Sequence, residues 1–331
     1  MNRHAIPKLS AFSLYALAAS AAALPALAQS VTAWPTKAIR VIVPFPSGGT
    51  SDILGRLIGQ KLTEAWGQQI LVDSRAGANG SIGTDLTVRA PPDGYTFLLT
   101  DVGGLMISPS VYPKLPYDPV RDLAPIGMVS YSPHLVGAHP SVPAKNMAEL
   151  IALAKKNPGK LNFPTGLGSA THLAGLAVQN RSGINWVYIP TKGGQQSLMT
   201  VATGEGDVMF LGMLQTLPHV KNGRIKVIAI SSEKRDPALP DIQTVSETSG
   251  FEGFHTGSWQ GLLGPAKLPA NIVNKFNGEL RRILALQDVK EKLGTQGTVP
   301  LPMTPAETGS FLLAEKERWA KVVKESGFKI E

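Results

Sequence analysis

Residues 39–52 read IRVIVPFPSGGTSD, and this stretch decides the fold class. A run rich in β-branched residues leads into a loop with two glycines, after which apolar residues recur at helical spacing. The pattern predicts a strand over 39–45, a turn, and a helix that ends at Gly67. A strand, a turn and a helix in this order begin a parallel βαβ unit.

The same alternation continues along the chain and predicts an α/β fold. Further strands are expected at 69–74, 95–100, 161–165, 184–190, 207–212, 225–230 and 259–265, with helical patterns between most of them. A proline-rich segment near 109–125 interrupts the rhythm and is expected to run along the surface. Two capping signals, Asn146 with Glu149 and Thr304 with Glu307, predict helix starts.

The length of 331 residues favours two domains. Before residue 134 the chain has too few helices to cover both faces of a parallel sheet, and the last helices need a sheet to cover. We therefore predict one discontinuous α/β domain over 29–133 plus 255–331 and a second α/β domain over 134–254. Two crossings between the domains predict a hinge with a ligand cleft beside it.

The N-terminus has the features of a secretory signal peptide. Residues 1–28 hold no acidic residue, carry Arg3 and Lys8 at the front, and continue as an apolar run that ends in an A-x-A pattern. We predict cleavage before Gln29 and a soluble product exported to the periplasm. A retained membrane anchor is the alternative, but the apolar run is short and Pro25 interrupts it.

Net charge and composition restrict the classes of ligand and of chemical site that the protein can have. The net charge is +8, yet the basic residues are scattered, which favours small anions over nucleic acid. The chain contains no Cys, so disulfides, thiolate metal sites, a Cys nucleophile and a lipoprotein anchor are excluded. Neither a G-x-S-x-G nor an H-E-x-x-H motif occurs, and no cofactor motif is present.

The histidine residues allow two other interpretations, a hydrolase site and a metal site, and the sequence supports both only weakly. Ser169 and His172 have the residue types of a nucleophile and a base, but their spacing is explained more simply by Ser169 as a helix N-cap. His134, His139 and His172 lack carboxylates at ligand spacing, so a metal site is disfavoured. We expect no enzymatic activity, no cofactor and no metal.

Four glycine-bearing loops follow predicted strands and open predicted helices. They cover residues 44–52, 75–81, 166–171 and 191–195. Free N–H groups and the positive end of a helix favour an anion at such loops. The alternative is that they are ordinary turns, with Thr50 or Ser51 capping the first helix and Ser81 the second.

These motifs together resemble the Bug family, the TctC-type extracytoplasmic solute-binding proteins of tripartite tricarboxylate transporters. The likeness runs from about Trp34 to Gly327 and rests on WPTKAIRVIVPFPSGGTSD, SRAGANGSIG, PPDGYTFLL, LPYDPVRDLAPIG, HLAG, IPTKGG, GEGDVMF, LPDIQTVSETSGF and WQGLLGP. The resemblance implies a periplasmic binding protein type II-like (Venus flytrap) fold. It also implies a protein that captures a mono- or dicarboxylate and passes it to membrane permease subunits.

The resemblance further implies that first-domain loops hold a carboxylate, partly through ordered water. The matching residues are Ser47, Gly48, Thr50, Ser51, Asp52, Asn79, Gly80 and Ser81, with Thr100 and Asp101 as further candidates. The remaining loops complete the predicted ligand-binding set with Phe45, Gly166, Gly168, Ser169, Thr171, Lys192 and Gly193. Lys192 has a second interpretation as a solvated charge.

This chain departs from the family pattern at three places. Ser47 stands where a proline is usual, Thr191 stands where a tyrosine is usual, and the loop at 166–169 is one residue shorter. These changes predict a wider cleft that accepts a longer or aromatic acid. An amino-acid ligand would need an acidic side chain for its ammonium group, for which Asp52 and Asp101 are candidates.

Two functions remain open at this stage. Transport is one, and the other is a ligand sensor that presents its bound form to a membrane histidine kinase. A monomer is expected for a carrier that closes by a hinge.

Overall fold

The computed structural model describes residue 1, residues 34–112 and residues 114–329, and residues 35–331 form one compact unit. The predicted signal peptide and the predicted mature start at Gln29 lie outside the described residues, Met1 excepted. Strands and helices alternate along the compact unit, so the α/β class is confirmed. Within the described residues no helix is both long and apolar enough to span a membrane.

The first part of the unit contains β1 (Ile39–Val43), α1 (Thr50–Trp66), β2 (Ile70–Ser74), the 3₁₀ turn η1 (Ala78–Gly80), α2 (Ser81–Val88), β3 (Thr96–Asp101), the π-helical turn η2 (Gly103–Ile107), α3 (Ser108–Val111) and β4 (Leu123–Ala138). The middle contains α4 (Met147–Lys156), β5 (Asn162–Thr165), α5 (Ala170–Ser182), β6 (Val187–Pro190), α6 (Gly194–Ala202), β7 (Val208–Gly212), α7 (Met213–Lys221), β8 (Lys226–Ile230) and η3 (Val245–Glu247). The last part contains β9 (Gly257–Pro265), α8 (Ala270–Ala285), α9 (Gln287–Gly294), β10 (Val299–Pro300) and α10 (Pro305–Ser326).

The main sheet has eight strands and is mixed. Its order is β10-β4-β9-β3-β1-β2, with β7 and β8 also paired to β4. The pairs β1–β2 and β1–β3 are parallel, as the βαβ pattern predicts, whereas β9 runs antiparallel to both β3 and β4. A separate parallel pair joins β5 and β6.

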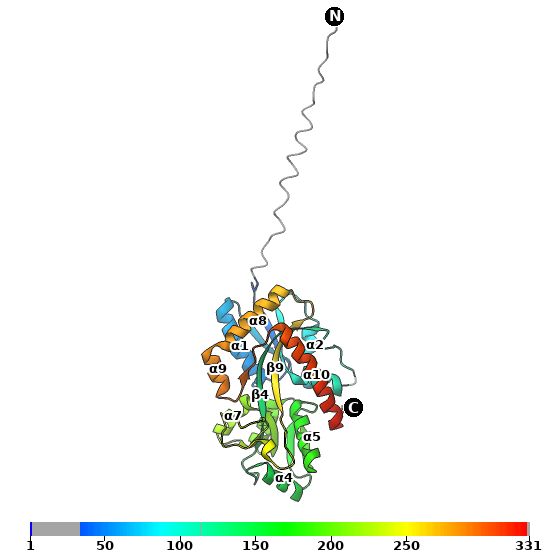
Figure 1. Ribbon diagram of the computed structural model, residues 1–331, viewed down its shortest axis with the longest axis vertical. Helices are drawn as coiled ribbons and strands as arrows, with labels where there is room; N and C mark the ends of the chain where they lie inside the picture. The colour runs from blue at the N-terminus through cyan, green and yellow to red at the C-terminus, as the bar shows by residue number, and fades with distance from the viewer. Residues whose placement is uncertain (2–33, 113, 330–331) are drawn as a thin grey trace. The chain divides into compact units, whose positions relative to one another are not determined.

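Strand β4 is 16 residues long, lies beside β9 (Figure 1), and changes partners along its length. Its segment 123–133 pairs with β9, while its segment 134–138 pairs with β7 and β8. The sequence pattern does not indicate this strand, because its start lies in the proline-rich segment. The predicted domain boundary at 133/134 falls where the partners of β4 change, and the division into two domains stays a prediction.

Two large apolar cores form on the two parts of β4. One contains Phe163 of β5, Phe210 of β7 and Trp186, whose rings pack together. The other packs residues of β3 and η2 against α10, and it includes Leu173 of α5. Helix α5 therefore joins the second core through its first turn, and this contact fixes its N-terminus relative to β3.

Several helix ends agree with the sequence signals. Asn146 accepts a hydrogen bond from Glu149 N–H, Thr304 and Glu307 form a capping box, and Gly67 ends α1 in the left-handed conformation. The prediction that Thr50 or Ser51 caps α1 is wrong, because both lie inside the helix and extended Gly49 is the N-cap residue. The prediction of a Ser81 cap on α2 is also wrong, because Gly80 holds that position.

Glu315 fastens α10 to the sheet. Its Oε2 accepts hydrogen bonds from the indole N–H groups of Trp259 on β9 (2.7 Å) and Trp319 on α10 (3.0 Å). Arg318 forms an ion pair with the same carboxylate. Burial works to raise the pKa of Glu315, but the hydrogen bonds from Arg318 and Trp259 outweigh it and hold the pKa below its ordinary value.

We predict that Glu315→Ala lowers the free energy of unfolding by about 3 kcal/mol, because it leaves two buried indole donors unsatisfied. Glu315→Gln keeps an oxygen for both indoles and should cost only about 1 kcal/mol. Urea denaturation of both variants measures the difference. Equal losses in the two variants would contradict this role of the shared oxygen.

Candidate ligand-binding site

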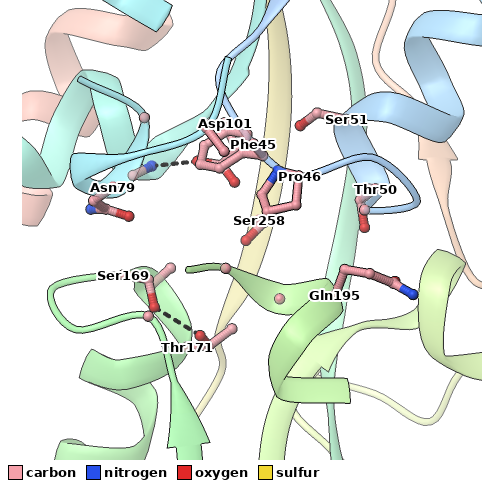
Figure 2. A pocket seen from close by; sticks show the side chains of 18 of the residues that line it. Phe45, Pro46, Thr50, Ser51, Asn79, Asp101, Ser169, Thr171, Gln195 and Ser258 are labelled. Atoms are coloured by element: carbon pink, nitrogen blue, oxygen red, sulfur yellow. Dashed lines mark hydrogen bonds between the residues drawn. The ribbon is translucent and has the colours of Figure 1, made fainter. Parts of the chain in front are cut away.

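One large cavity of about 580 Å³ lies beside the point where β4 changes partners. Figure 2 shows Phe45, Asn79 and Asp101 on one side of it, Ser169, Thr171 and Gln195 on the other, and Ser258 between them. We call the side that carries Asp101 the first wall and the side that carries Thr171 the second wall. The volume is in the range of small-molecule sites.

Five helices begin at this cavity. Their N-cap residues all line it, and these are Gly49 of α1, Gly80 of α2, Ser169 of α5, Gly193 of α6 and Gly212 of α7. The four glycine caps carry no side-chain capping bond, and a glycine lets a ligand approach the backbone closely. The positive ends of five helix dipoles therefore favour an anion in this space.

The loop before α1 is held in place from outside the cavity. Asp52 accepts hydrogen bonds from Gly48 N–H (3.0 Å), from Arg56 (3.0 Å) and from Ser74 Oγ (3.3 Å). Burial works to raise the pKa of Asp52, but the bonds from Arg56 and Gly48 outweigh it and lower the pKa. Asp52 is thus ionised and supports the loop. Its carboxylate oxygens already accept hydrogen bonds from groups of the protein.

The loop before α2 adopts a strained conformation. Ala78 (φ 46°) and Asn79 (φ 50°) both lie in the left-handed region, which L residues rarely occupy. Asn79 Nδ2 donates to Gly168 O at 2.9 Å, across the cavity. Such strain persists where the surroundings fix it, and it concentrates at functional sites.

Neighbouring strands β4 and β9 supply the floor of the cavity, with Ser132, His134, Ser258 and Gln260. The His134 ring is buried, and its Nε2 and Nδ1 lie 2.9 Å from Ser258 Oγ and 3.1 Å from Thr256 Oγ1. Burial lowers the pKa of His134 to about 3, so the imidazole is neutral at physiological pH. The floor is therefore polar but uncharged.

Two hydrogen bonds cross the cavity. Besides the bond from Asn79 to Gly168, Thr50 N–H donates to Gln215 Oε1 at 3.0 Å. Gly193 also lies close to the first wall, since a Cβ there would meet Pro46 Cδ at 3.0 Å. The two walls are thus in contact around the cavity in this structure.

The structure brings together residues from all four predicted loops. The predicted ligand-binding residues that line the cavity are Phe45, Thr50, Ser51, Asn79, Gly80, Asp101, Gly166, Ser169, Thr171, Lys192 and Gly193. The predicted residues outside its lining are Ser47, Gly48, Asp52, Ser81, Thr100 and Gly168. The hydroxyl of Ser47 donates to Ser74 Oγ (3.1 Å), so the serine that departs from the family pattern adds no hydroxyl to the cavity lining.

Sequence reasoning missed the floor and one helix start. The start of α7 at Gly212 was missed because that strand runs into its helix without a glycine-rich loop. The floor was missed because its residues lie inside strands. A signal was present, since Ser130, Ser132 and His134 alternate with apolar residues at the period of a strand.

The site provides little support for catalysis. The Oγ atom of Ser169 accepts from His172 N–H as an N-cap, as predicted, while His172 Nδ1 accepts from Gly168 N–H. The imidazole therefore does not accept a proton from this serine. Among the described residues no cluster of His, Asp or Glu side chains is arranged to hold a metal ion.

An α/β fold with helix N-termini around one cavity suits a protein that binds a small anionic solute. The chain belongs to the tripartite tricarboxylate transporter family receptors, whose family model, TctC, matches residues 54–328. Protein BugT of Bordetella pertussis is 33% identical over 304 residues, which cover 91% of this chain and 93% of BugT. The predicted resemblance to the Bug and TctC proteins is confirmed.

Solved structures agree on the fold. Rpa4515 of R. palustris with adipate has 31% identity and a TM-score of 0.87, with 89% of this chain and 99% of that chain covered. The periplasmic binding protein BugD has 31% identity and a TM-score of 0.86, with 90% and 100% covered. MatC from Rhodopseudomonas palustris with bound malate has 28% identity and a TM-score of 0.82, with 88% and 100% covered. The binding-protein fold is confirmed, and the family is one of receptors and not of enzymes.

The buried His134 predicts a pH dependence of stability. Its folded pKa of about 3 lies below the ordinary 6.5, so the unfolded chain binds the proton first and stability falls as the pH drops through 6.5. Between pH 7 and pH 5 this loss amounts to about 2 kcal/mol. The free energy of unfolding should therefore fall by about that much more in the wild type than in His134→Asn.

Chemical denaturation at the two pH values measures this difference. The control is His139→Asn, whose ring is partly exposed and hydrogen-bonded to Ser141. That variant should keep the pH response of the wild type. The same response in wild type and His134→Asn would show that His134 is not the titrating group.

Proposed function

We propose that this protein captures a small organic carboxylate in the cavity and delivers it to the membrane permease subunits of a tripartite tricarboxylate-type transporter. The convergence of five helix N-termini on one cavity carries the proposal, because it supplies backbone N–H donors and positive dipole ends for an anion. The adipate and malate bound to two structural relatives support it.

Ligand binding is proposed at the cavity-lining residues of the predicted set and at the floor. Side chains with formal charge are few there, namely Asp101 and Lys192 within the described lining. Affinity for the carboxylate then comes chiefly from N–H and hydroxyl donors of both walls. A ligand that contacts both walls favours the closed arrangement, because it has higher affinity for that state.

The ligand is proposed to be a mono- or dicarboxylate, with longer and aromatic acids included. Phe45, Tyr112, Leu167 and Leu211 give the cavity apolar surfaces beside its polar loops. Such surfaces suit a hydrocarbon chain or ring between carboxyl groups. The two predicted domains, 29–133 plus 255–331 and 134–254, are proposed to close over it.

Export of the protein is part of the proposal. The signal features of residues 1–28 and the family of periplasmic receptors support removal of that segment before Gln29 and residence in the periplasm.

The protein purified from the periplasm should bind at least one acid in a series of aliphatic mono-, di- and tricarboxylates and aromatic acids. At a ligand concentration of about 100 times Kd, stability should rise by about 2.7 kcal/mol, which a thermal-shift assay detects. Gln215→Ala removes the amide that accepts from Thr50 N–H across the cavity, so it weakens the contact between the two walls that the ligand bridges, and calorimetry should show about tenfold weaker binding.

The matched control is Gln69→Ala, an exposed position outside the cavity, which should leave the affinity unchanged. Within the series, the proposal of a wide cleft expects the longer or aromatic acids to bind best. Tightest binding by the shortest acids would overturn that part, and binding by amines or sugars alone would overturn the carboxylate proposal.

Deletion of the gene should abolish high-affinity uptake of the bound acid, and restoration of the wild-type gene should recover it. A plasmid-borne Gln215→Ala variant should raise the half-saturating concentration for uptake while Gln69→Ala behaves as wild type. Normal uptake in the deletion strain, with loss of an acid-dependent transcriptional response, would favour sensing through a histidine kinase over transport.

A further inference from the structure

Asp101 is the only acidic side chain that lines the cavity among the described residues. It ends β3, and its Oδ1 accepts a hydrogen bond from Gly103 N–H at 2.7 Å. The side chain is half-buried, and it takes part in no ion pair within the part of the chain that the structure describes. The cavity therefore contains a carboxyl group without a cation beside it.

The elements packed on β3 provide no counter-ion for Asp101. Strand β9 and turn η2 contain no charged side chain. The charged side chains of β1, α1 and α2 are engaged elsewhere, namely Arg40 with Asp73, Arg56 with Asp52, Lys61 with Asp288, Glu64 with Gln60, and Asp85 with Arg89. Their side chains thus leave the charge of Asp101 uncompensated.

The remaining titratable groups of the cavity do not compensate it either. Lys192 is exposed in the loop before α6, on the second wall, and forms no ion pair with Asp101 in the structure. His134 on the floor is neutral, because burial lowers its pKa to about 3. Burial also raises the pKa of Tyr112, so this phenol stays protonated near neutral pH.

A carboxylate ligand in this cavity brings a second negative charge close to Asp101. When two carboxylates lie within hydrogen-bond distance of each other in a site removed from bulk water, one of them takes up a proton. Burial already raises the pKa of Asp101 to about 7, against the opposing bond from Gly103 N–H. Protonation of this side chain is therefore accessible at neutral pH.

We propose that Asp101 carries a proton in the ligand complex, so that the protein binds one carboxylate ligand together with one proton. The proton comes from solvent, stays on the Asp101 carboxyl group, and is donated as an O–H hydrogen bond to the ligand carboxylate. It returns to solvent when the ligand leaves, and no covalent bond forms. The inference rests on the proposed function and adds to it a residue that couples affinity to pH.

The proposal fixes the direction of the pH dependence. Above a free-state pKa of about 7 the ligand has to bind with proton uptake, so affinity falls about tenfold for each further pH unit. Between pH 6 and pH 9 the dissociation constant should therefore rise about 100-fold. Isothermal titration calorimetry at pH 8, in two buffers of different ionisation enthalpy, should show uptake of close to one proton per ligand.

Adipate is the first probe, followed by the best-binding acid of the series described above. Asp101→Asn keeps the size of the side chain and provides an N–H donor that needs no proton. This variant should bind with a nearly constant dissociation constant between pH 6 and pH 9, take up no proton, and exceed the wild type in affinity at pH 9. Asp241→Asn, at an exposed position outside the cavity, should keep the wild-type pH dependence.

The outcomes separate this inference from the proposed function. Tight binding of acids by the wild type with constant affinity and no proton uptake overturns the inference alone. Failure of every acid to bind between pH 5 and pH 9 overturns the proposed function and the inference together. Affinity that rises with pH for a ligand with an ammonium group also overturns the inference, because Asp101 then acts as an ionised partner. The wild-type proton count decides the matter even when Asp101→Asn does not fold.

Discussion

The continuous strand β4 and its antiparallel pairing with β9 form the constraint on which the site depends. The pairing places Tyr131 opposite Trp259 and Ser132 opposite Ser258, and the next residue pairs, beyond Pro133, belong to β7 and β8. A slip of one residue would turn the floor side chains away from the cavity. The register of two strands thus fixes the polar floor, and both walls are attached to it.

The chemistry of the walls follows from the use of backbone in place of charged side chains. At four of the five helix starts the N-cap residue is a glycine, which has no side chain to accept from the first-turn N–H groups, although Gln215 accepts from Thr50 N–H of α1. Asp52 stabilises the first loop from outside the cavity. Its carboxylate accepts a hydrogen bond from Gly48 N–H and forms an ion pair with Arg56. A site built this way favours an anion through many weak donors, so the shape of the cavity and the position of Asp101 contribute much of the selectivity between acids.

The sequence predicted the elements that local signals specify and missed those that depend on tertiary pairing. The helix N-caps at Asn146, Ser169 and Thr304 are specified by residues nearby in the sequence, and the structure confirms all three. The N-terminal half of β4 was missed because four prolines in 109–119 and Pro125 indicate a loop, whereas pairing with β9 overrides that preference. The incorrect caps at Thr50 and Ser81 show the converse, because a preceding glycine provides the turn without any side-chain acceptor.

Contacts between the two walls reduce the binding energy that a ligand has to supply to bring the walls together. Besides the bonds from Asn79 and Thr50, the ring of His172 on α5 meets the ring of Phe328 after α10 at 4.5 Å between centroids. These contacts hold the two walls together in this structure without any ligand. In the proposed closure over the ligand, the ligand then needs only a modest difference in affinity between open and closed states to populate the closed one. A carboxyl group that accepts a proton on binding then adjusts that difference with pH, without any change in the contacts that hold the walls together.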